Sequence, residues 1–126
     1  MTDPEMSPSR KVADLLMRKI QSRDRLKKDA PELLEGFSQL VKHCHGGEAL
    51  DRKQKELMAI AASVATVCIP CLANHARNAF LAGASRQEIF EAAAVGVEFG
   101  GAPSFVAVRD NLPDFMDEIE ASSKND

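Results

Sequence analysis

Apolar residues recur at helical spacing along the whole of this 126-residue chain, and no segment shows sustained alternation of apolar and polar residues. Val12, Leu15, Leu16 and Ile20 form the first apolar stripe, and a second stripe begins behind Pro31, a residue suited to the first turn of a helix. A strand with one buried face needs a period of two, so the pattern leaves no segment for a sheet. The sequence therefore predicts an all-α fold of about six to seven helices.

Capping signals indicate where several of these helices begin and end. Asp51 is followed three residues later by Gln54, and Ser85 by Glu88, which is the pattern of a capping box at a helix start. Glycines are the usual residues just past a helix end, and three such positions fit the expected ends of the second, fourth and fifth helices: Gly46–Gly47, Gly83 and Gly100–Gly101.

Prolines subdivide the remaining helical stretches. Pro70 lacks an amide donor, so we expect a break between the third and fourth helices there, with the fourth beginning at Pro70 or Cys71. Pro103 restarts a sixth helix. Asn111 and Pro113 indicate a further break, followed by a short terminal helix.

The length fits a single domain over residues 1–126, with its core at about residues 31–115 and flexible termini. The third, fourth and fifth helices are rich in alanine, and the chain has six phenylalanines but no tryptophan or tyrosine. Such helices bury little apolar area each, so the core of a lone chain would be thin. We therefore expect a homo-oligomer that shares helical surface.

Composition argues against several functional classes. The net charge is −3 at pH 7, without the basic face that binding to nucleic acid requires. No apolar run approaches the roughly 18 residues of a membrane span, and the polar start does not resemble a targeting segment. We expect a cytoplasmic protein that binds neither nucleic acid nor membrane.

The chemistry is concentrated in the spacing Glu56-x11-Cys68-x2-Cys71-x3-His75. In a reducing compartment a close Cys-x-x-Cys pair indicates catalysis or metal binding rather than a structural staple. The break at Pro70 places both sulfurs near a helix N-terminus, which favours the thiolate, and His75 lies one turn beyond Cys71 on the same face.

Glu56 is expected to join this site only through the fold. Along an uninterrupted helix it lies about 18 Å from Cys68. The fourth helix would have to fold back antiparallel against the third to bring His75 towards Glu56. Because two turns cover only part of that distance, we expect water or a neighbouring subunit to complete the contact.

A structural zinc site is the alternative interpretation of the same residues. Cys68, Cys71 and His75 resemble three zinc ligands, and His43, Cys44 or His45 could supply the fourth. The pair lies at a helix junction rather than in a glycine-containing turn, which favours redox chemistry. Cys44 falls on the apolar stripe of the second helix and is expected in the core. His43 and His45 are expected to interact with the dipole of that helix.

The four-residue motif, its context ELMAIAASVATVCIPCLANHARNAFLAGASRQEIFEAA and the following FGGAPSF resemble the AhpD-like branch of the carboxymuconolactone decarboxylase family over residues 31–115. The resemblance implies an all-α fold in hexamers or, as a second choice, trimers. It also implies a thiol-dependent peroxidase, with a hydroperoxide as substrate, an external dithiol or lipoyl-type reductant and no bound cofactor. Members that catalyse the decarboxylation lack the cysteine pair, so that reaction is not expected here.

By this resemblance Cys71 attacks the peroxide, Cys68 resolves the sulfenic acid into a disulfide, and Glu56 and His75 relay protons. The chain departs from the best-known member at Pro70, where that member has a histidine of the relay. A different activity of the same dithiol therefore stays open, namely disulfide exchange without peroxide. A zinc-stabilised interaction module is the non-enzymatic alternative.

Overall fold

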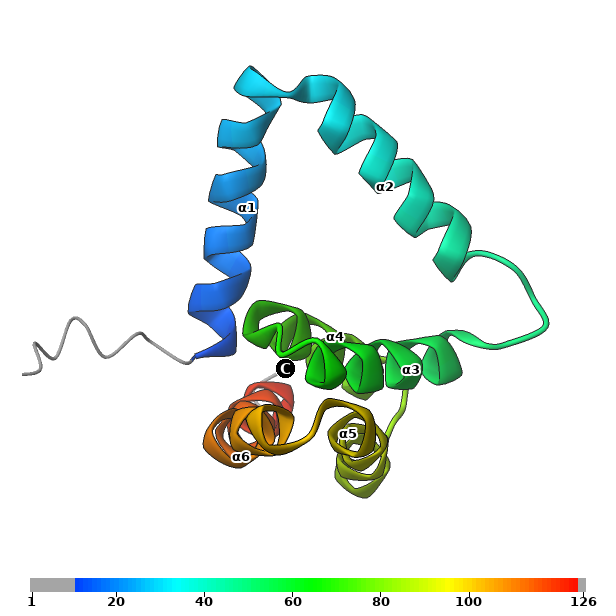
Figure 1. The fold of residues 1–126 in the computed structure, drawn as a ribbon, viewed down its shortest axis with the longest axis vertical. Coiled ribbons are helices and arrows are strands. Elements are labelled where there is room, and N and C mark those ends of the chain that lie inside the picture. The colour runs from blue at the N-terminus through cyan, green and yellow to red at the C-terminus, as the bar shows by residue number, and fades with distance from the viewer. Residues whose placement is uncertain (1–10, 125–126) are drawn as a thin grey trace, which may run out of the picture.

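The computed structural model describes residues 11–124 and shows only helices within that range. The all-α prediction is confirmed, with six helices: α1 (Val12–Asp29), α2 (Pro31–His45), α3 (Arg52–Ala65), α4 (Ile69–Leu81), α5 (Arg86–Gly100) and α6 (Ala102–Lys124). Helices α3 to α6 form a bundle, from which α1 and α2 project as an open arm (Figure 1). Of the termini expected to be flexible, outside residues 31–115, the described parts are helical in α1 and at the end of α6, whereas residues 1–10 and 125–126 lie outside the described residues.

Local side-chain bonds begin helices α3 and α5 as expected. Asp51 accepts a hydrogen bond from the Gln54 amide while Gln54 bonds back to the Asp51 amide, and Ser85 and Glu88 do the same at α5. Each pair satisfies two amides that have no partner inside the helix. Both predicted capping boxes are confirmed.

The core lies where α3, α4, α5 and α6 meet, and it is made of aliphatic side chains and one phenylalanine. Its largest fully buried apolar members are Ile60, Val64, Leu72, Ile89, Leu112, Phe115 and Met116. Alanines fill the spaces between them, with Ala73, Ala76, Ala79 and Ala93 all at 0% exposure. Small side chains thus let the four helices pack closely around a modest core.

Helices α3 and α5 approach each other closely at two glycines of α5. A Cβ added to Gly96 would lie 2.4 Å from the Ala61 carbonyl oxygen and 2.7 Å from the Val64 Cβ. One added to Gly100 would lie 3.0 Å from the Ala65 carbonyl oxygen and 1.8 Å from the Ser104 hydroxyl. The absence of a side chain at both positions is therefore what allows this contact.

The break expected at Pro113 is wrong, because α6 is one helix that runs through it. Leu112, Phe115 and Met116 are fully buried on either side of Pro113 and continue one apolar stripe across it. An interior proline costs about 3 kcal/mol, and burial of three large side chains at about 1.5–3 kcal/mol each outweighs that cost.

The arm is attached to the bundle through α1. Val12 is buried, and the Glu118 carboxylate of α6 accepts hydrogen bonds from the amides of Val12 and Ala13 at 2.7 and 3.0 Å. A carboxylate at a helix N-terminus satisfies open amides and interacts favourably with the dipole. The start of α1 is thus capped by a residue more than 100 positions away in the sequence.

Helix α2 packs against α1, and none of its residues is buried in the described part of the chain. Its apolar face is exposed, with Leu33 at 64% and Phe37 at 62%. Cys44 is exposed as well, so the expectation that it packs in the core is wrong: its helix does not reach the core. Among residues 11–124, no helix combines the length and apolar character that crossing a membrane requires.

Candidate functional site

The chain reverses between α3 and α4 in a Schellman motif that leads directly into Cys68. The Cys68 amide donates to the Ser63 carbonyl at 2.9 Å, and the Val67 amide donates to the Val64 carbonyl at 3.1 Å. Val67 occupies the left-handed position of this motif, with φ of 55°. Glycine is usual there, so a β-branched residue carries strain immediately before the first cysteine.

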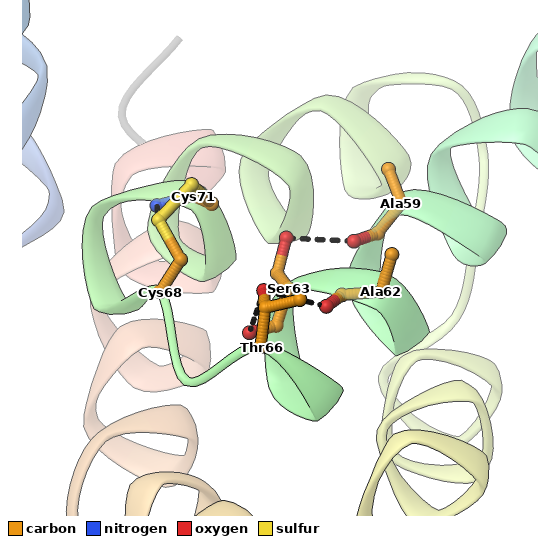
Figure 2. The surroundings of a disulfide bond; sticks show 6 residues. All are labelled: Ala59, Ala62, Ser63, Thr66, Cys68 and Cys71. Carbon is orange, nitrogen blue, oxygen red and sulfur yellow. Dashed lines mark hydrogen bonds between the residues drawn. A yellow bond between two sulfur atoms is a disulfide. The ribbon is translucent and has the colours of Figure 1, made fainter. Parts of the chain in front are cut away.

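Cys68 is the N-cap residue of α4, and its Sγ accepts a hydrogen bond from the Cys71 amide at 3.3 Å. The two cysteines form a disulfide, with 5.2 Å between their Cα atoms (Figure 2). In the dithiol state the same end of α4 would favour a thiolate at Cys68 through its open amide and the helix dipole.

Hydroxyl groups near the disulfide are used within α3. Ser63 Oγ donates to the Ala59 carbonyl at 2.6 Å, and Thr66 Oγ1 donates to the Ala62 carbonyl at 2.8 Å (Figure 2). Both bonds point back along their own helix rather than towards the sulfurs.

Glu56 and His75 are in direct contact, although α3 and α4 are different helices. His75 Nδ1 lies 2.7 Å from Glu56 Oε1, at a carboxylate whose side chain is only 7% exposed. The expectation that water or a neighbouring subunit completes this contact is wrong, because α4 packs closely enough along α3 for the two side chains to meet.

This contact determines which nitrogen of His75 is available for chemistry. An ionised carboxylate only accepts hydrogen bonds, so when Glu56 is ionised the proton of this contact belongs to His75 Nδ1. Nε2 is then left to accept a proton from another group. Because His75 follows Cys71 by one turn of the continuous helix α4, its ring and the Cys71 sulfur lie on one face. The arrangement therefore places an oriented base one helical turn beyond Cys71.

His45 also belongs to this cluster, although from the sequence it was expected only to interact with the dipole of its helix. His45, at the end of α2, places Nδ1 3.7 Å from Glu56 Oε2 and stacks parallel to the His75 ring, with 6.1 Å between centroids. One feature of the sequence could have indicated this contact: the connection from His45 to α3 is short, so the chain returns close to the part of α3 that carries Glu56.

The remaining candidates for metal binding lie apart from the dithiol. Within the described residues, no group of three or more His, Cys, Asp or Glu side chains could hold a metal ion. His43 and Cys44 are exposed on α2. The fold brings Cys68 and Cys71 together in one group, and His45, Glu56 and His75 in another.

Comparisons with known proteins are consistent with this fold. The model of the carboxymuconolactone decarboxylase family matches residues 31–110. An uncharacterised protein of the cox locus of Paracoccus denitrificans is 30% identical over 88 residues, which is 70% of this chain and 78% of that protein.

Two solved structures extend the comparison over most of the chain. A carboxymuconolactone decarboxylase family protein of Legionella pneumophila has a TM-score of 0.76 at 30% identity, covering 86% of this chain and 96% of its own. A Thermotoga maritima family member, described with a possible role in antioxidative response, has a TM-score of 0.79 at 26% identity, covering 89% of this chain and 94% of its own.

Proposed function

Since this chain belongs to the carboxymuconolactone decarboxylase family, we propose that it is a peroxidase of the AhpD-like branch, which uses Cys68 and Cys71 to reduce hydroperoxides. The observation that carries the proposal is the 2.7 Å contact of Glu56 with His75, one turn beyond Cys71. An oriented imidazole beside a dithiol can both remove a thiol proton and return it to a leaving oxygen. The antioxidative description of the Thermotoga maritima relative supports the same class of substrate.

The proposed reaction balances without a bound cofactor. The Cys71 thiolate attacks the distal oxygen of ROOH, the O–O bond breaks, and His75 supplies the proton that converts the leaving alkoxide into ROH. Cys68 then gives up its thiol proton and attacks the sulfur of the resulting sulfenic acid, whose hydroxyl takes up that proton and leaves as water while the disulfide forms. An external dithiol, of lipoyl or similar type, reduces that disulfide. Such a cycle suits the reducing cytoplasm, where we place the protein.

The cysteine roles can be tested by following thiol loss in reduced protein mixed with a panel of hydroperoxides. We expect a loss of two hydrogens from the peptide that contains Cys68 and Cys71. Cys71→Ser should abolish peroxide consumption, whereas Cys68→Ser should form a sulfenic acid that a dimedone-type reagent traps. Cys44→Ser, which alters the exposed third cysteine, is the matched control and should behave as wild type. Persistent thiols at both positions under excess peroxide would exclude the peroxidase.

One observation favours a second candidate function, disulfide exchange without peroxide. Cys68, not Cys71, is the N-cap residue of α4 and accepts the Cys71 amide bond, so the helix end favours Cys68 as the attacking thiolate. Rates with a small disulfide and with peroxide, measured on the same reduced protein, separate the two functions. An exchange enzyme would react faster with the disulfide and would lose that reaction in Cys68→Ser.

A further inference from the structure

Two imidazoles from different helices share the buried Glu56 carboxylate. His75 Nδ1 lies 2.7 Å from Oε1, and His45 Nδ1 lies 3.7 Å from Oε2, within ion-pair reach but beyond a direct hydrogen bond. The two rings are parallel to within 3°. The Glu56 side chain is 7% exposed, whereas that of His45 is 33% exposed. Each carboxylate oxygen therefore faces one histidine.

The connection between α2 and α3 holds His45 in this place. It reverses direction at Gly47, whose φ of 87° suits glycine. The Lys55 ammonium group donates to the Gly46 carbonyl, one residue past His45. Because Lys55 directly precedes Glu56, the loop is tied to α3 beside the carboxylate that His45 faces.

A second contact, at Oε2, can restrict rotation of the Glu56 carboxylate, which the His75 bond alone does not do. Rotation of a glutamate carboxylate about its last side-chain bond is broad and weakly restricted, so one bond at Oε1 leaves its plane free to turn. A polar N–H facing Oε2 restricts that rotation, and its attraction is stronger at a site largely removed from water. The Glu56 carboxylate of α3 and the His75 ring of α4 both lie against His45.

We propose that His45 is a positioning residue of the Glu56–His75 pair. It faces Oε2 so that Oε1 stays on His75 Nδ1, and it thereby keeps His75 Nε2 free for the dithiol. The effect on catalysis rests on the proposed function, whereas the effect on the proton of His75 does not.

The test uses the reduced full-length protein and three variants. His45→Leu removes the ring nitrogens, and His45→Asn retains an N–H at a position close to that of Nδ1. His43→Leu is the matched control, because His43 is exposed and lies about 200° around the same helix. Nitrogen-15 NMR of the imidazoles reports which nitrogen of His75 carries the proton, and circular dichroism checks that each variant is folded.

We expect Nδ1–H at His75 in wild type and a smaller Nδ1–H population in His45→Leu. Peroxide turnover in His45→Leu should lose about tenfold in kcat at unchanged KM, since a positioning residue contributes less than the 10²–10⁴-fold of the base itself. His45→Asn should recover part of the Nδ1–H population of His75 and part of kcat. His43→Leu should match wild type in both.

The proposal is overturned if His45→Leu keeps the wild-type Nδ1–H population and kcat, if KM changes in place of kcat, or if His45→Asn recovers nothing. A wild-type protein that turns over neither peroxide nor disulfide would defeat the proposed function alone. The NMR comparison of His45→Leu with His43→Leu would still decide the role of His45.

Discussion

At the scale of single residues, strain is concentrated immediately before the dithiol. Val67 has a left-handed backbone, and its amide and that of Cys68 complete the Schellman motif that ends α3. A β-branched residue in that conformation costs on the order of 1–2 kcal/mol. The cost is offset by the packing of α3 and α4 on either side. Val67 thus directs the chain so that Cys68 caps α4.

Replacing Val67 with glycine should therefore stabilise the protein. Relief of the strain outweighs the added freedom of glycine in the unfolded chain, and we expect a gain of roughly 0.5–1 kcal/mol, measured by urea unfolding. Val95→Gly is the matched control, because Val95 is similarly exposed, at 50% against 43%, but lies inside α5. That substitution should destabilise. Loss of stability in both variants would show that the backbone at Val67 is not strained.

At the scale of secondary-structure elements, the contact of α3 with α5 depends on the missing side chain at Gly96. Gly96→Ala would place a Cβ against the Ala61 backbone carbonyl and Val64, neither of which can move without shifting a helix. We expect a loss of about 2–3 kcal/mol in the free energy of unfolding, as for an overpacked core.

Gly36→Ala is the control for helix propensity. Nothing lies within 4 Å of a Cβ at Gly36, in the middle of α2, so this substitution should stabilise by about 0.5–1 kcal/mol. If Gly96→Ala lowers the free energy of unfolding and Gly36→Ala raises it, measured in the same thermal or urea series, the close approach of α3 and α5 at Gly96 is established. Equal effects would contradict it.

An ion pair adds a pH-dependent link between the same two helices. Lys53 bonds to Glu88 at 2.8 Å, and this bond, followed by that from the Ser85 amide, lowers the pKa of the Glu88 carboxyl. A carboxyl whose pKa is lower in the folded than in the unfolded protein stabilises the folded state at pH values above its unfolded pKa. This stabilisation is lost as the pH falls through the pKa of the folded state. The contribution of Glu88 is therefore present at neutral pH and disappears in acid.

The variant Glu88→Gln tests this link, because it keeps an acceptor for the Ser85 amide but not the charge. Its deficit in unfolding free energy relative to wild type should be present at pH 7 and shrink in acid, as the pH falls through the lowered pKa of the Glu88 carboxyl. Glu98→Gln, on the exposed side of the same helix, is the control and should show no such change. A deficit that stays constant with pH would rule out the ion pair as its source.

The elements themselves were predictable where the signal was local. Each capping box depends on two residues three positions apart, so Asp51 with Gln54 could be recognised without knowledge of the fold. Pro113 misled the prediction because its penalty is local, whereas the burial of Leu112 and Phe115 that outweighs it is tertiary. The Schellman turn at Val67 was missed because its sequence lacks the expected glycine.

The candidate site was predictable as a set of residues but not as a contact network. The spacing of Cys71 and His75 follows from one helix, so their shared face could be expected. The direct contact of Glu56 with His75 depends on how closely α3 and α4 pack, and helix lengths alone suggested a gap. His45 depends on the path of a loop, for which the sequence offers no periodic signal.

At the scale of the whole molecule, the open arm leaves apolar surface uncovered. Leu33, Phe37 and Leu40 on α2 are each more than half exposed, and so are Phe99 and Phe105 near the α5–α6 junction. Exposed apolar side chains in such number are typical of surfaces that contact another chain. We propose that this chain assembles with copies of itself, with a hexamer as first choice and a trimer as second.

Light scattering at micromolar concentration should therefore give about six times the chain mass of 13.7 kDa. Phe37→Lys should shift the population towards monomer, because it places a charge on the apolar face of α2. Gln39→Lys, on the same helix and beside Glu35, should leave the assembly intact. A monomeric wild type, or equal dissociation by both variants, would contradict self-association through α2.

Because His45 lies at the end of α2, the helix that offers its apolar face to other copies also carries a member of the Glu56 cluster. A lone chain has little besides α1 and the short loop to hold that helix in place. Assembly would thus do more than bury surface: it would set the catalytic rate per chain. Specific activity should then fall when the protein is diluted below its association range, so the amount of protein in the cell would itself determine how active each copy is.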